Sequence, residues 1–138
     1  MALKSGDIVY DYSYLWLRQK RAGETEGRKL RPICVAIAVK NVDGETHLAL
    51  LPISSQPPQP GQRAIKLAKS EMKRIGLADG KDAWIYVSEY NYDVVEHSYY
   101  MKPIAGKPKS LSPAFMKQIL QSFRETLQSK VGRVSRSE

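Results

Sequence analysis

Arg31, Ser54 and Glu26 are residue types that could act together on a phosphate group. Arg31 comes just before an apolar run at residues 33–39, and Ser54 directly follows a second apolar run at residues 47–53. A guanidinium offers five fixed donors and a permanent charge that suit phosphate oxygens, a serine hydroxyl adds a hydrogen bond, and a glutamate can carry a proton. This set suits metal-free RNA cleavage, in which the ribose 2′-OH attacks its own phosphate. On residue types alone, however, an arginine ahead of a strand is more often structural than catalytic.

The two apolar runs predict neighbouring antiparallel strands. In residues 33–39 large side chains alternate with small ones, which is typical of a strand buried on both faces. An Asp-Gly pair then favours a tight hairpin turn, after which residues 46–53 return as the partner strand. Proline is tolerated at the first residue of a strand, so Pro32 is predicted to begin its strand and Arg31 to lie in the loop just before it. This pairing brings Arg31 and Ser54 to the same end of the sheet, where we expect the chemistry.

The rest of the chain predicts further strands and two helices. Tyrosines at every second position favour a strand within residues 6–14, and short strands are also expected at 64–67, 83–90 and 94–101. A short helix is predicted at 69–75, ended by Gly76. A longer helix is expected after Ser112, a good N-cap, with Pro113 at its first position and one apolar stripe. The stripe consists of Met116, Ile119, Leu120, Phe123 and Leu127.

This order of elements predicts an α+β fold. Strands come first, one short helix lies in the middle and one longer helix closes the chain, which favours a small, curved antiparallel sheet or partial barrel with helices on one side. The length of 138 residues suits one domain. We place that domain at residues 1–130 and a disordered basic tail at 131–138. Residues 18–27 are polar, interrupted by glycine, and predicted to form a long mobile loop that is either functional or a solvated hairpin tip.

The net charge of +8 and the pI near 9.6 favour polyanionic partners such as nucleic acid or an acidic protein segment. The charge is uneven, because residues 104–138 carry seven basic against two acidic side chains, whereas residues 76–103 carry two against five. The alternative is a solubilising charge with a disordered tail.

Other classes of site and location are disfavoured by the sequence. His47 and His97 lie far apart with no cysteine cluster, so neither a metal site nor a cofactor is expected. Cys34 lies mid-strand and is expected to be a buried, inert thiol. No apolar run approaches the roughly 20 residues of a membrane span, and the N-terminus lacks the apolar core of a signal peptide. A cytoplasmic protein with no membrane partner is therefore expected.

Three motifs together resemble the MazF/PemK (Kid-like) family of toxins from type II toxin–antitoxin systems. They are Gly6-Asp-Ile-Val-Tyr10, Glu26 followed five positions later by Arg31-Pro32, and Pro52-Ile-Ser-Ser-Gln56. The resemblance covers residues 5–56 well and 64–129 more loosely. It implies an SH3-like barrel, a homodimer, and a cofactor-free endoribonuclease (an mRNA interferase) that cuts single-stranded RNA and is neutralised by a cognate acidic antitoxin.

The resemblance also implies roles for individual residues. Arg31 matches the family's arginine, which stabilises the phosphorane and takes part in proton transfer; Ser54 matches its catalytic threonine, and Glu26 matches its acidic residue. Contacts to the RNA would come from the loop between the first two strands and from the segment after Ser54. These residues are Arg18, Lys20, Arg21, Arg28, Lys29, Ser55 and Gln56.

Two other functions remain open on the sequence. A non-catalytic toxin of the same fold could inhibit a protein target, as gyrase poisons do, although such a binder has no need of a phosphate-binding corner. An inactive RNA-binding homologue could stack bases on Tyr90 and Tyr92, although tyrosines in strands more often serve packing.

Overall fold

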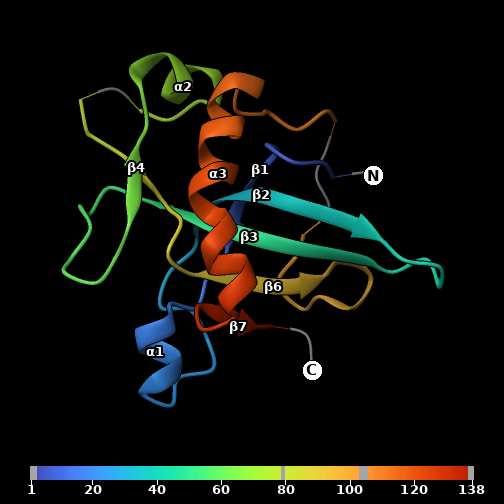
Figure 1. The fold of residues 1–138 in the computed structure, drawn as a ribbon. Helices are drawn as coiled ribbons and strands as arrows, with labels where there is room; N and C mark the ends of the chain where they lie inside the picture. The colour runs from blue at the N-terminus through green and yellow to red at the C-terminus, as the bar shows by residue number, and fades with distance from the viewer. Residues whose placement is uncertain (1–2, 79, 103–105, 137–138) are drawn as a thin grey trace.

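The computed structural model describes residues 3–78, 80–102 and 106–136, and it has the α+β organisation expected from the sequence (Figure 1). Its strands form one seven-stranded sheet that is not closed into a barrel among the described residues. All pairs are antiparallel except β6 with β7. The strands are β1 (Ile8–Tyr12), β2 (Arg31–Lys40), β3 (Thr46–Ser54), β4 (Ala64–Lys66), β5 (Trp84–Tyr86), β6 (Tyr90–Val94) and β7 (Arg133–Ser135).

The β2–β3 hairpin is the centre of the sheet, and its register confirms the predicted pairing of the two apolar runs. Ile33 lies opposite Pro52, and Lys40 opposite Thr46. The sequence predicted Arg31 in a loop before the strand, but Arg31 is the first residue of β2. It belongs to the strand because β1 also pairs with this end of β2 and sets Tyr12 opposite Arg31. The hairpin therefore carries Arg31 on a strand that is held from both sides.

The strand predicted at residues 83–90 is wrong, because two separate strands occupy this part of the chain. β5 pairs with the last residues of β3, where Ile53 faces Ile85, and β6 pairs with its first half, where Leu50 faces Asn91. Between these two pairs, β3 has only two residues, 51 and 52, whereas the opposite chain has five, 86–90. The additional residues 87–89 therefore leave the ladder. The strand predicted at 94–101 is also wrong, since β6 ends at Val94 and a 3-10 helix (Val95–His97) follows.

The two predicted helices are confirmed. α2 (Lys69–Arg74) is followed by Gly76, whose φ of +73° suits a residue without a Cβ. α3 (Pro113–Ser129) begins where its capping signal lies, and the Ser112 hydroxyl accepts a hydrogen bond from the Phe115 amide. α3 lies across the sheet (Figure 1). The apolar stripe of α3 packs into a core cluster with residues of β1, β3 and β5.

The N-terminal strand is shorter than predicted, and the loop after it contains a helix. β1 ends at Tyr12, and Asp11 has a positive φ of 58° at an irregularity in the β1–β2 register, which breaks the alternation of the tyrosines. α1 (Leu17–Arg21) forms within the segment predicted as a mobile loop. It packs through the buried Gln19, whose side-chain oxygen accepts a hydrogen bond from the Trp16 amide at 3.1 Å.

The basic tail predicted at residues 131–138 is not a frayed end over its described part. β7 pairs with β6 in parallel, setting Val134 opposite Asn91, and Val134 is fully buried. The Arg136 amide extends this pairing by donating to the Tyr92 carbonyl at 2.8 Å. A long-range partner, which a local pattern does not reveal, makes this short segment a strand; residues 137–138 lie outside the described residues.

Candidate functional site

A cavity of about 670 Å³ opens at the end of the sheet where β2 begins and β3 ends. Arg31 and Ser54 both line it, as their predicted meeting requires, because each lies two residues beyond the Ile33–Pro52 pair. The other walls come from α1 and the residue before it, from the proline-rich loop after Ser54 and from the irregular segment between β5 and β6. They include Trp16, Leu17, Arg18, Arg21, Lys29, Gln56, Pro57, Gln59, Pro60, Gly61, Gln62, Tyr86, Ser88 and Glu89.

The guanidinium of Arg31 has no anionic partner among the described residues. Its central carbon lies 5.2 Å from the centroid of the Trp16 ring, on which the Arg18 guanidinium also lies, at 5.1 Å. Its Nε is buried, and in the described part of the chain this atom has no hydrogen-bond partner and no carboxylate forms an ion pair with the side chain. Burial first, and then the charge of Arg18, lower the pKa of Arg31. A positive charge held in this way favours an anion in the cavity.

Ser54 is buried at the cavity wall with its hydroxyl oriented by the chain that follows. The oxygen accepts a hydrogen bond from the Gln56 amide at 3.1 Å, so the hydroxyl proton remains available for donation to a ligand. The Tyr86 hydroxyl donates to the Gln56 carbonyl, which holds the same loop from its other side. Gln56 thus fixes Ser54 and also lines the cavity.

Glu89 is a site residue that the sequence reasoning missed. Its carboxylate is buried in the cavity wall, where it accepts hydrogen bonds from the Leu17 amide at 2.9 Å and from the Tyr14 hydroxyl at 3.1 Å. Burial raises the pKa of Glu89, against the opposing effect of these hydrogen bonds and of the neighbouring arginines. No local pattern in the sequence indicates this role, because residues 87–89 leave the ladder and their direction depends on how β5 and β6 pair with β3.

Glu26, in contrast, does not line the cavity. Its Oε1 accepts a hydrogen bond from the Tyr100 hydroxyl at 2.9 Å, and the Tyr100 ring packs edge-on against Tyr12. The structure therefore does not bring Glu26 together with Arg31 and Ser54. The spacing of five positions between Glu26 and Arg31 does not determine which way the carboxylate faces.

The predicted RNA-binding residues divide into two groups. Arg18, Arg21 and Lys29 line the cavity with Arg31. The side chain of Arg28 forms an ion pair with Glu24 instead, at 2.6 Å. Lys20 and Ser55 are exposed outside the cavity walls. The cavity is strongly basic because of the first group, and Glu89 is its one acidic lining residue in the described part of the chain.

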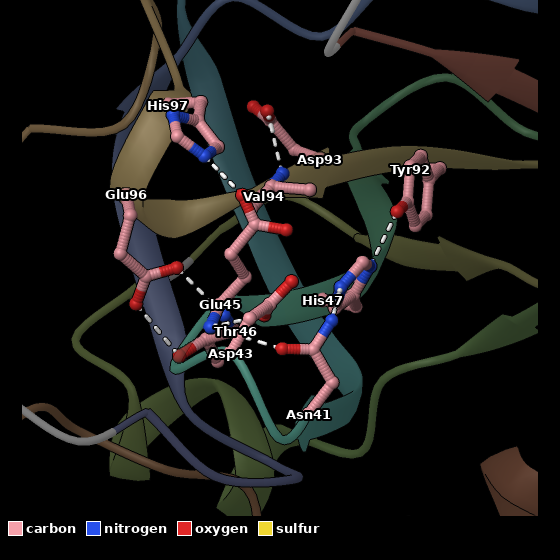
Figure 2. A network of polar contacts seen from close by, with 10 residues as sticks. All are labelled: Asn41, Asp43, Glu45, Thr46, His47, Tyr92, Asp93, Val94, Glu96 and His97. Carbon is pink, nitrogen blue, oxygen red and sulfur yellow. Dashed lines mark hydrogen bonds and ion pairs between the residues drawn. The ribbon is translucent and has the colours of Figure 1, made fainter.

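The chain also contains a second cluster of residues that often carry chemistry, at the tip of the β2–β3 hairpin (Figure 2). There His97 contacts the Glu45 carboxylate, His47 lies between Asn41 and Tyr92, and Glu96 accepts two hydrogen bonds from Thr46. None of these residues lines the cavity that contains Arg31. Within the described residues no group of three or more His, Cys, Asp or Glu could hold a metal ion. The side chains of the cluster are thus paired with one another or with the backbone.

Comparison of the chain with models of protein families, with curated proteins and with solved structures finds no match. The resemblance to MazF/PemK toxins therefore rests on the sequence motifs, and the function has to be judged from the groups in the cavity. No helix in residues 3–78, 80–102 and 106–136 is long and apolar enough to cross a membrane.

Proposed function

We propose that this chain is a metal-independent endoribonuclease that cuts single-stranded RNA, a toxin of the MazF/PemK type neutralised by an acidic antitoxin. The observation that carries the proposal is the Arg31 guanidinium, which is half buried in a basic cavity beside a serine hydroxyl and has no anionic partner in the described part of the chain. An unpaired buried charge is costly, so a site that keeps one is suited to an anion supplied by a ligand.

Arg31 would bind the scissile phosphate and stabilise its transition state. As the 2′ oxygen attacks phosphorus, charge builds up on the non-bridging oxygens, and fixed donors aimed at those oxygens lower the barrier. Ser54 would donate its hydroxyl proton to the same group, since its oxygen already accepts from Gln56. Arg18, Arg21 and Lys29 would contact the flanking phosphates.

Glu89 would carry the proton of the attacking hydroxyl. In this step the 2′ O–H proton passes to the carboxylate and the 2′ oxygen bonds to phosphorus. The bond to the 5′ oxygen breaks to leave a 2′,3′-cyclic phosphate, and the departing 5′ oxygen takes a proton from water. A carboxylate whose pKa is raised by burial is a stronger base than an exposed one, and it lies within the cavity. We therefore assign to Glu89 the proton transfer for which Glu26 was the candidate in the sequence.

The fold and the charge agree with this proposal. A curved sheet that is open at its edges, with α3 across one face, fits a partial SH3-like barrel. The net charge of +8 fits both an RNA strand and an acidic antitoxin. The homodimer implied by the resemblance belongs to the same proposal.

The test is incubation of the purified chain with a long single-stranded RNA in EDTA, followed by mapping of the new 3′ ends. The wild type should give discrete cuts that end in 2′,3′-cyclic phosphate, and Arg31→Ala should give none. Arg124→Ala, which removes an equal charge from the exposed side of α3, is the matched control and should cut like the wild type. Intact RNA with a well-folded wild type would overturn the enzyme proposal.

The same experiment addresses the two alternatives from the sequence. Tight RNA binding without cuts would indicate an inactive RNA-binding protein, but Tyr90 is buried and Tyr92 lies beneath the Arg133 guanidinium, at 4.1 Å from the ring centroid, so neither ring is free to stack on a base. Toxicity that survives Arg31→Ala would indicate a protein target.

A further inference from the structure

A second cavity, of about 530 Å³, lies at the other end of the fold. Figure 1 places α2 and the start of α3, which contribute to it, at the opposite end of the molecule from α1, which contributes to the Arg31 cavity. Its polar wall consists of Lys4, Ser5, Arg74, Lys107 and Ser110, and its apolar wall of Pro108, Leu111, Pro113 and Met116. Three of these side chains are basic and none is acidic.

The backbone under this cavity is held in place by two buried carboxylates. Asp7 accepts hydrogen bonds from the Lys4 amide at 2.9 Å and from the Ser110 hydroxyl at 2.6 Å. Glu71 of α2 accepts from the amide and the hydroxyl of Ser112, at 2.9 and 2.7 Å. These bonds join the N-terminal segment, α2 and residues 110–112, which lead into α3, although the three lie far apart in the sequence. The backbone segments at the bottom of the cavity are therefore fixed relative to one another by these hydrogen bonds.

The basic side chains of this cavity have no anionic partner in the part of the chain that the structure describes. No ion pair joins Lys4, Arg74 or Lys107 to a carboxylate. The buried carboxylates of Asp7 and Glu71 accept the hydrogen bonds from Lys4, Ser110 and Ser112 described above. The three cations therefore face the cavity with their charge available to a ligand.

We propose that this cavity binds the phosphate of a nucleotide, with the ribose or base against the apolar wall. One arginine and two lysines around one hollow suit the several oxygens of a phosphate group, and the volume exceeds that of a phosphate alone while lying in the usual range for small-molecule sites. Pro108, Leu111, Pro113 and Met116 give the apolar surface that a sugar or base requires. The phosphate comes either from a free mononucleotide or from a strand of RNA, and the inference is independent of catalysis at Arg31.

The test measures binding of AMP, adenosine and inorganic phosphate to the full chain by calorimetry and by amide chemical shifts. AMP should shift the amides that line this second cavity, whatever it does at the Arg31 cavity, and adenosine should bind there at least about tenfold more weakly because it lacks the charge. Arg74→Gln/Lys107→Gln should weaken AMP binding about tenfold or more. Lys40→Gln/Arg124→Gln removes the same charge from exposed positions outside both cavities, and it should change the affinity less than about twofold.

A second arm uses a short RNA with 2′-O-methyl groups, which the proposed reaction at Arg31 cannot cut. If AMP competes with this RNA at the second cavity, a free nucleotide is a sufficient ligand; if only the RNA binds and the double variant weakens it, the phosphate belongs to a strand. Equal binding of AMP to the two double variants, or no binding of either probe, would overturn the proposal. Arg31→Ala should leave AMP binding at this cavity intact, which separates it from the proposed catalysis.

Discussion

The hairpin cluster of Figure 2 and the Arg31 cavity both contain ionisable side chains, but these are paired in the cluster and incompletely paired in the cavity. The cluster holds two histidines and several carboxylates, and their side chains are paired with one another. The cavity holds fewer such groups, but Arg31 keeps a buried Nε without a partner among the described residues, and Glu89 is held in the wall. A binding site is thus marked by groups whose interactions are incomplete, and the abundance of histidine and acid is a poorer guide.

The largest effect in this comparison should come from removing the unpaired cation. Arg31→Ala should reduce RNA cleavage by about 10²–10³-fold or more, since a fixed donor to the developing charge is lost. The measurement is the rate of cleavage under single-turnover conditions. The paired counterpart is His47→Ala in the cluster, which removes the hydrogen bonds to Asn41 and Tyr92 and should leave the rate unchanged. If Arg31→Ala and His47→Ala lost the same amount of cleavage rate, the unpaired cation would matter no more than the paired histidine.

Glu89→Gln should cause the next loss, of about 10²–10⁴-fold, because an amide cannot accept the 2′ proton. The wild-type rate should rise with pH as the carboxylate ionises, with a midpoint above the usual range for glutamate because burial raises this pKa. That limb of the pH profile should be absent in Glu89→Gln, which a merely structural role would not explain. Glu26→Gln, the corresponding change outside the cavity, should retain the rate and its pH profile.

The raised pKa of Glu89 also makes the stability of the fold depend on pH. Because the folded state holds the proton more tightly than the unfolded state, the free energy of unfolding should fall as pH rises from the unfolded pKa through the folded one. Glu89→Gln should lack this fall and be at least as stable as the wild type at neutral pH, measured by urea unfolding at several pH values. A wild type whose stability is flat across this window, or rises, would contradict the burial that we assign to Glu89.

The sequence could predict the parts of the fold that local patterns determine. The β2–β3 hairpin follows from two apolar runs joined by a turn, and α3 follows from its cap and stripe. The break between β5 and β6 could not be predicted, because it results from the pairing of both with one strand. β7 is likewise a strand only because β6 lies beside it.

The same division applies to the candidate site. Arg31 and Ser54 could be brought together from the sequence, since the register of one hairpin decides their distance. Trp16 and Glu89 reach the cavity through α1 and through the segment that leaves the ladder, and neither follows from a local pattern. Glu26 was assigned by its spacing from Arg31, but its carboxylate is bound by Tyr100 instead.

A smaller effect on catalysis is expected from Ser54→Ala. Loss of one neutral hydrogen bond to the phosphate should slow cleavage about 5–10-fold, which corresponds to roughly 1 kcal/mol. Ser54→Thr keeps the hydroxyl and should restore most of the rate, with the additional methyl restricting its rotamers. A threonine variant as slow as the alanine variant would mean that the hydroxyl does not act on the substrate.

The smallest effect should come from the contact between His97 and Glu45 in the cluster. The side chains of His97 and Glu45 are 61% and 32% exposed, and exposed pairs contribute only about 0.2–1 kcal/mol because water and salt screen them. His97→Gln should therefore lower the free energy of unfolding by no more than that amount, and the difference should shrink in high salt, with RNA cleavage unchanged. If this variant instead lost cleavage while remaining folded, a completely paired group would be taking part in function, and unpaired groups would no longer distinguish the site from the rest of the surface.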